Sequence, residues 1–158
     1  MISKITDRVF IGEYSDVVGP TPEETTSRLK QLQALGIGHV VSLCARTQIT
    51  KEEAAFKANS PLGIWLHHQP IPVNKKSAGR RDAFKLGLEL ALNEIVTILG
   101  DEPNAKILIH CTAGIDRAPF VVASYLVRVC GLDLADAYRQ IKKIRSCVCE
   151  HYDWVWWT

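Results

Sequence analysis

Apolar side chains recur along the chain in two spacings, which predict strands and helices in turn. Short apolar runs predict strands over residues 8–12, 39–44, 64–68 and 106–110. Apolar residues at helical spacing predict helices over residues 21–36, 82–99, 119–129 and 134–144. Strands that alternate with helices indicate an α/β fold, with a central, mostly parallel sheet flanked by helices on both faces.

Capping residues and prolines mark where these elements begin and end. Thr21 is placed as an N-cap, with Pro22 in the first helical turn, and Gly36 ends the same helix. Two prolines and a polar stretch predict a loop over residues 70–81. Neither a repeat nor a linker interrupts the pattern, so residues 1–158 are expected to form a single domain.

Composition adds limits to this picture. Hydrophobic residues make up 47% and charged residues 23%, which is typical of a globular chain, and no run is long enough for a transmembrane segment. The net charge of +2 gives no reason to expect a polyanionic partner, and sequence-specific nucleic-acid binding is not predicted. The oligomeric state has no signal in the sequence.

The cysteine pattern bears on the compartment. Five cysteines at irregular spacing do not form a disulfide framework, and the N-terminus lacks the features of a signal peptide. A reducing, cytoplasmic location is therefore expected, where a reactive thiol stays available.

The segment that joins the strand at 106–110 to the next helix carries the candidate chemistry. Loop N–H groups and the positive end of a helix would converge there, which favours binding of a tetrahedral dianion and favours thiolate over thiol at Cys111. Arg117, six residues later, is positioned to bind two phosphate oxygens, and Gly114 allows close backbone approach. The predicted phosphate-binding loop consists of His110, Cys111, Thr112, Ala113, Gly114, Ile115, Asp116 and Arg117.

This loop satisfies the pattern HCxxGxxR, and the chain resembles the protein tyrosine phosphatase superfamily in its dual-specificity branch. Further likenesses are the segments 8–12, 35–43 and 131–138, so the resemblance covers nearly the whole chain. It implies the compact cysteine-phosphatase fold and a two-step reaction through a phosphocysteine intermediate. It implies neither a metal nor an organic cofactor.

The resemblance leaves the substrate open. The first expectation is a dual-specificity protein phosphatase acting on phosphorylated Tyr, Ser or Thr. HCTAG followed by RAP is similar to plant glucan phosphatases, which makes a phosphoglucan or phosphoinositide phosphatase the alternative. Segment 43–46 is similar to tensin-like lipid phosphatases, where the cysteine equivalent to Cys44 can form a disulfide with the nucleophile. A catalytically inactive phosphate-binding protein is the second alternative.

The proton donor is where the sequence departs from the family. The family's loop aspartate is replaced by Val73 or Asn74, neither of which is an acid. Asp82 lies 29 residues before Cys111, near the family's usual separation, and is either the acid or the first carboxylate of the long helix. Asp116 is either a relocated acid, as in myotubularin-type phosphatases, or a structural partner of Arg117. A third interpretation is that the chain has no acid.

Other features also have two interpretations. Ala118 replaces a Ser or Thr that helps the thiolate to leave, which suggests slower hydrolysis of the intermediate. The basic residues of the 70–81 loop form either a solvated loop or a rim that selects polyanionic phosphates. They are Lys75, Lys76, Arg80 and Arg81. Trp154 is expected to pack on the core, and the spacing of Cys147, Cys149 and His151 fits no standard zinc pattern.

Overall fold

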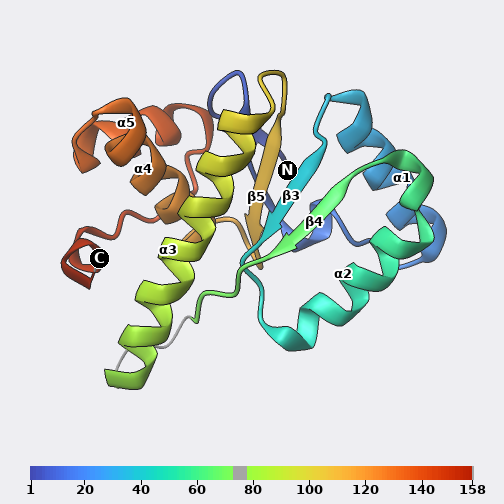
Figure 1. The fold of residues 1–158 in the computed structure, drawn as a ribbon, viewed down its shortest axis with the longest axis horizontal. Helices are drawn as coiled ribbons and strands as arrows, with labels where there is room; N and C mark the ends of the chain where they lie inside the picture. Colours follow the sequence, from blue (N-terminus) through green and yellow to red (C-terminus); the bar gives the residue numbers. More distant parts are fainter. Residues whose placement is uncertain (73–77, 158) are drawn as a thin grey trace.

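The computed structural model describes residues 1–72 and 78–157, and side chains are described except at Ala78 and at residues 155–157. Its centre is a five-stranded sheet in the order β1-β2-β5-β3-β4, in which only β1 runs antiparallel to its neighbour (Figure 1). The strands are β1 (Ser3–Lys4), β2 (Val9–Glu13), β3 (His39–Ser42), β4 (Trp65–His68) and β5 (Ile107–Cys111).

Helices cover both faces of the sheet, as the sequence predicted. They are α1 (Pro22–Ala34), α2 (Arg46–Ala58), α3 (Ala78–Asp101), α4 (Arg117–Cys130) and α5 (Leu134–Ile144). Helices α3, α4 and α5 lie on one side of the strands, and α1 and α2 lie on the other (Figure 1). The mixed α/β prediction is therefore confirmed. No helix in the described part of the chain is long and apolar enough to cross a membrane.

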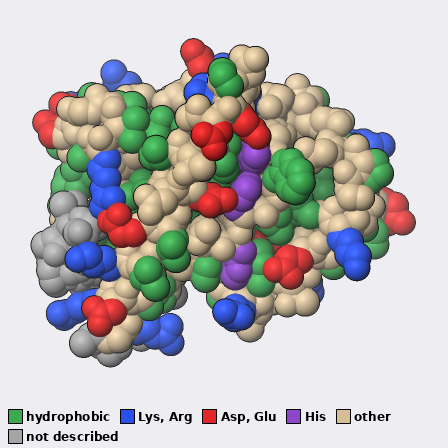
Figure 2. All heavy atoms as spheres, viewed as in Figure 1, with side chains coloured by type: hydrophobic (Ala, Val, Ile, Leu, Met, Phe, Trp, Pro, Cys, Tyr) green, Lys and Arg blue, Asp and Glu red, His purple; other side chains and the backbone are tan. Residues whose placement is uncertain are grey.

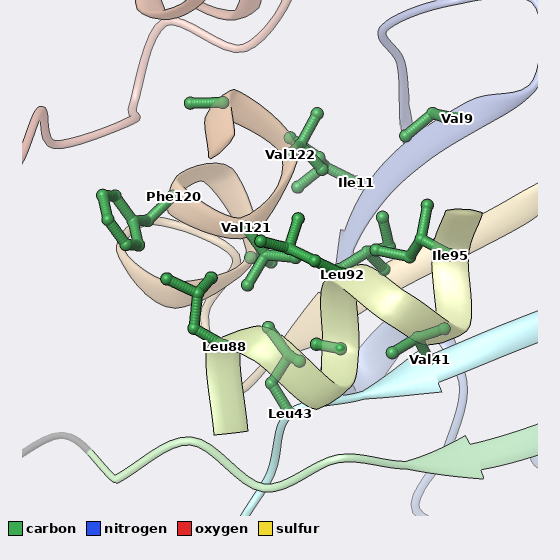
Figure 3. Close-up of a cluster of buried hydrophobic side chains, with 14 of the residues drawn as sticks. Val9, Ile11, Val41, Leu43, Leu88, Leu92, Ile95, Phe120, Val121 and Val122 are labelled. Atoms are coloured by element: carbon green, nitrogen blue, oxygen red, sulfur yellow. The ribbon is translucent and has the colours of Figure 1, made fainter. Parts of the chain in front are cut away.

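Successive side chains along the strands point to opposite faces of the sheet and belong to two separate hydrophobic clusters. Ile107 and Ile109 of β5 join the cluster beneath α3 and α4, and Leu108 between them joins the cluster beneath α1 and α2. Figure 3 shows the first cluster, where Leu88 and Leu92 of α3 lie among side chains of α4 and the strands. The sheet is thus buried on both faces, which explains its continuous apolar strands.

Several element boundaries match the sequence predictions, and others do not. The Thr21 hydroxyl accepts a hydrogen bond from the Glu24 amide at 3.2 Å, which confirms the predicted cap of α1. The prediction of a loop through residue 81 is wrong at its end, because α3 already begins at Ala78. Asp82 is the fifth residue of α3, so it lies after the first turn and does not cap the N-terminus of that helix, as one interpretation of it required. Strand β1 and helix α2 were not predicted.

Histidines tie the sheet edge to α3. The rings of His39 on β3 and His67 on β4 stack and share a hydrogen bond at 3.0 Å. Their outer nitrogens contact Glu102 and Glu94, at 2.6 and 2.5 Å. Figure 2 shows histidine side chains in a column on one face of the molecule, with acidic side chains beside them. Burial outweighs the nearby carboxylate Glu94 and lowers the pKa of His67.

Candidate active site

The candidate site lies where the central strand β5 ends and α4 begins. Strand β5 pairs in parallel with β2 on one side and β3 on the other, so their carboxyl ends meet at one edge of the sheet. In α/β sheets, this edge is where ligands bind. Cys111 is the last residue of β5, and Arg117 is the first residue of α4, so the intervening loop faces this edge.

Cys111 is buried against the first turn of α4. Its side chain is 2% exposed, and the backbone N–H of Ala118 points at the sulfur, with N and Sγ 3.5 Å apart. An N–H donor and the positive end of a 14-residue helix both place positive potential at the sulfur. At Ala118, the backbone rather than a side-chain hydroxyl contacts the sulfur.

Arg117 is held by backbone carbonyls on the far side of the loop. Its Nη1 atom donates to the carbonyl oxygens of Leu43 at 3.2 Å and Ile71 at 3.1 Å. Its Nη2 atom donates to the Thr112 hydroxyl within the loop, at 3.1 Å. Arg117 is 9% exposed, and these three hydrogen bonds fix the orientation of its guanidinium, with one edge at the loop that would bind an anion.

A buried ion pair lies at the end of β5, immediately before the loop. The Nε2 atom of His110 lies 2.5 Å from Oε1 of Glu52, and both side chains are fully buried. Burial alone would lower the pKa of His110, but hydrogen bonds to Cys44 and Glu52, and the charge of Glu52, raise it to about 10. The Ser42 hydroxyl donates to the second oxygen of Glu52, at 2.8 Å. His110 is therefore protonated at neutral pH, one residue before Cys111.

Cys44 belongs to the same buried group. Its sulfur lies 3.8 Å from Nδ1 of His110, and its carbonyl oxygen is 2.8 Å from Nε2 of His68. Cys44 and Cys111 are both free thiols. The role of Cys44 as a disulfide partner of Cys111 stays a prediction.

The outer side of the loop contacts the segment that follows α5. Nε of Arg145 donates to the Gly114 carbonyl at 2.8 Å, and its Nη2 donates to the Ala113 carbonyl at 3.4 Å. The Cys149 amide donates to the Ile115 carbonyl at 3.0 Å. Three consecutive loop residues are thus bound by this segment, which fixes the curvature of the loop.

Asp116 continues this series of contacts. Its Oδ1 atom lies 2.6 Å from Nε2 of His151, and the Asp116 side chain is half exposed. The carboxylate partner is therefore His151, and not Arg117 as one interpretation of the sequence had it. The His151 ring stacks on Trp154, with ring centroids 3.7 Å apart, and Trp154 packs on the core as expected.

The remaining predicted residues lie on or before α3. Asp82 is exposed in the early part of that helix, and Arg80 and Arg81 are exposed in its first turns. Val73, Asn74, Lys75 and Lys76 lie outside the described residues. The 70–72 segment reaches the site through the Ile71 carbonyl that binds Arg117.

Sequence reasoning did not identify Glu52 and His151 as parts of this site. Glu52 lies 58 residues before His110 along the chain, in a helix that was not predicted. His151 follows a cysteine-containing segment, and a zinc site was the only role considered for it. The available sequence signal for Glu52 was an acidic residue at helical spacing with the apolar residues Ile49 and Phe56.

Comparison with known proteins identifies the family. Residues 21–156 match the family described as dual specificity phosphatase, catalytic domain, and the chain belongs to it. The match includes every element from α1 to α5 and the loop from Cys111 to Arg117.

Individual relatives are distant in sequence. The chain is 27% identical over 159 residues to tyrosine-protein phosphatase vhp-1 of Caenorhabditis elegans, covering 98% of this chain but 20% of the relative. It is 28% identical over 141 residues to protein tyrosine phosphatase PRL-1 of Leishmania major, covering 88% and 76% of the two chains. The chain thus spans a fifth of the length of the nematode relative.

Solved structures share the fold. The human tyrosine phosphatase-like serine/threonine/tyrosine-interacting protein superimposes with a TM-score of 0.76 at 20% identity, covering 99% of this chain and 91% of the other. Kinase associated phosphatase superimposes with a TM-score of 0.69 at 19% identity, covering 98% and 89%. At this identity, the superpositions show a common fold.

Proposed function

We propose that the protein is a cysteine-dependent phosphatase that hydrolyses phosphomonoesters of phosphorylated proteins. The observation that carries this proposal is the contact of the Ala118 N–H with the Cys111 sulfur, beside a guanidinium already fixed by two carbonyls. A nucleophile, a backbone N–H donor beside it and an oriented arginine are parts that phosphoryl transfer to cysteine requires. Membership of the dual specificity phosphatase family supports the same reaction.

In the first step, the Cys111 thiolate attacks phosphorus, the bond from phosphorus to the ester oxygen breaks, and the leaving oxygen takes a proton. In the second step, water attacks the phosphocysteine, which releases inorganic phosphate and restores the thiolate. Arg117 binds the equatorial phosphate oxygens in both steps and stabilises their charge as the phosphoryl group transfers. With Ala118 after the arginine, the backbone N–H of Ala118, in place of a side-chain hydroxyl, assists the departing thiolate.

For proton delivery to the leaving group, we propose Asp82 ahead of Asp116. Asp82 is exposed, lies beyond the first turn of α3, and follows the 70–72 segment that contacts Arg117. Asp116 already binds His151 at 2.6 Å. The distinction is testable, since an acid matters most when the leaving group is poor.

The substrate class proposed is phosphorylated Tyr, Ser or Thr in proteins, as the family description suggests. The location proposed is the cytoplasm, because all five cysteines are free thiols and a reducing compartment would keep Cys111 active.

The decisive experiment compares the wild-type protein with Cys111→Ser on an aryl phosphate and on phosphopeptides. Turnover in the wild type, and its loss by more than about a thousandfold in Cys111→Ser, is expected because the thiolate is the nucleophile. Binding of phosphopeptides without turnover between pH 5 and 8 would instead identify an inactive phosphate-binding protein. Release of phosphate from phosphoinositides or phosphoglucans in preference to phosphopeptides would reject the proposed substrate class.

The same assay tests the acid. Asp82→Asn is expected to lower kcat for an alkyl phosphate at least tenfold more than for an aryl phosphate with a good leaving group. The reason is that a general acid usually contributes about a hundredfold or more to the rate, mainly when the leaving group is poor. Asp116→Asn is the matched control on the other candidate and is expected to show no such selectivity. If Asp116→Asn shows this leaving-group selectivity and Asp82→Asn does not, Asp116 is the general acid.

A further inference from the structure

Asp116 poses a charge problem for a loop that binds a dianion. It immediately precedes Arg117, so its carboxylate is within reach of both the guanidinium and a bound phosphate. A carboxylate that folded onto Arg117 would occupy the phosphate-binding group, and a free one would repel the substrate. Some feature of the molecule must hold it elsewhere.

The position of Asp116 in α4 sharpens this problem. Asp116 is the N-cap residue of α4, where an aspartate ordinarily accepts hydrogen bonds from the first helical N–H groups. Here its side chain makes no such bond. The Asp116 side chain therefore does not cap the N–H groups of the first turn, and one of them, from Ala118, points at the Cys111 sulfur.

The Asp116 carboxylate binds His151 instead. Its Nε2–H donates to Oδ1 of Asp116 at 2.6 Å, while Arg117 contacts Leu43, Ile71 and Thr112. When the ring carries its second proton, the pair has no net charge. The contact therefore orients the carboxylate, and with the ring in that form it also cancels the carboxylate's charge beside the loop.

The imidazole is itself fixed in place. It stacks on Trp154 at an interplanar angle of 7°, and Trp154 packs edge-on against Phe84 of α3 and Phe120 of α4. The His151 backbone N–H donates to the Tyr138 hydroxyl of α5, at 3.2 Å. A ring stacked on a packed tryptophan, with its own backbone bound to α5, is a rigid support for one carboxylate.

We propose that His151 is a positioning residue for phosphate binding, which holds the Asp116 carboxylate away from Arg117 and neutralises it. This inference rests on the proposed function, and it assigns to the His151–Asp116 pair the task of keeping the loop electropositive. The pair acts on affinity for the phosphate group, in the substrate and in the transition state alike.

The test is a double-mutant cycle read out by calorimetric binding of tungstate, a tetrahedral dianion that needs no turnover. His151→Asn is expected to weaken tungstate binding about tenfold, because one nearby uncompensated charge remains. Asp116→Asn is expected to bind at least as tightly as the wild type. Asp116→Asn combined with His151→Asn is expected to return to within about twofold of the wild type, since the charge that needed compensation is gone.

Three outcomes separate the possibilities. If the double variant binds as weakly as His151→Asn, the ring acts through the fold and the proposal is overturned. If His151→Asn binds like the wild type, the proposal is also overturned. If the wild-type protein itself does not bind tungstate, the loop from Cys111 to Arg117 is not a phosphate-binding loop. The proposed phosphatase function is then rejected, whatever the role of His151.

A second measurement covers the case in which His151→Asn does not fold. In the wild type, tungstate affinity is expected to fall more steeply with rising pH than in Asp116→Asn, which has no carboxylate charge for the ring to compensate. The charged or titratable groups around the ring are Asp116 on the loop and Tyr138 on α5, with Glu150 adjacent in the chain and close to Lys142. Identical pH profiles in the two proteins would overturn the proposal.

Discussion

At the scale of single residues, the buried ion pair of His110 and Glu52 combines a stability role with an electrostatic one. Neither side chain is exposed, and Glu52 is the sole carboxylate shown in contact with His110 among the described residues. Two charges without solvent depend on each other, because removing either leaves the other buried and unpaired. The pair also places a protonated imidazole one residue before Cys111, with the Glu52 carboxylate as its counter-ion.

Glu52→Gln is expected to lower the free energy of unfolding by about 3–5 kcal/mol at pH 6, the usual cost of breaking a buried ion pair. The pKa of His110 is raised to about 10, above its unfolded value. Its stabilising contribution is therefore complete below about pH 6.5 and is lost as the pH rises through about 10. Urea unfolding at pH 6 and pH 9 measures both effects.

The neighbouring Glu53 provides the control, since it lies in the same helix and is exposed. Glu53→Gln is expected to change stability by less than about 0.5 kcal/mol at either pH. A Glu52→Gln protein as stable as this control would show that the ion pair contributes nothing to folding.

At the scale of elements, the phosphate-binding loop is shaped by contacts with β2 and with the segment after α5. Gly114 has φ +66°, and an added Cβ would lie 2.6 Å from the Gly12 carbonyl oxygen and 2.6 Å from Nη2 of Arg145. Gly114→Ala is expected to cost at least about 1–3 kcal/mol of stability from the backbone conformation alone. Because the loop must shift, kcat/KM is expected to fall more than tenfold.

Gly38→Ala is the matched control for this change. Gly38 has nothing within 4 Å of an added Cβ, and its φ is not positive. Thermal unfolding and steady-state kinetics of the two variants measure the difference. Equal effects of the two substitutions would contradict the role assigned to the loop contacts.

The elements also show which features local sequence predicts. Helix α5 has the predicted bounds, and the loop from Cys111 to Arg117 was found because its parts are contiguous in the chain. Helix α2 was missed because its buried positions, Ile49, Glu52 and Phe56, include a charged residue whose burial depends on a distant histidine. Contacts made through tertiary structure, such as His151 with Asp116, leave no periodic signal.

At the scale of the whole molecule, the sheet makes the two hydrophobic clusters depend on each other. Adjacent residues of one strand face opposite clusters, as Val40 and Val41 do on β3. Losing either layer of helices would expose one face of a sheet that is apolar on both sides. We therefore propose that residues 1–158 fold as a single cooperative domain.

Leu32→Ala and Leu88→Ala test this proposal from opposite sides of the sheet. Leu32 of α1 belongs to one cluster and Leu88 of α3 to the other, and both are fully buried. Each substitution is expected to lower the free energy of unfolding by about 2–5 kcal/mol, through lost burial and a residual cavity. If the clusters unfold together, urea curves from circular dichroism and tryptophan fluorescence will coincide, and each variant will shift both curves equally. Two resolved transitions, each moved by only one of the substitutions, would instead mean that the layers on the two faces of the sheet unfold separately.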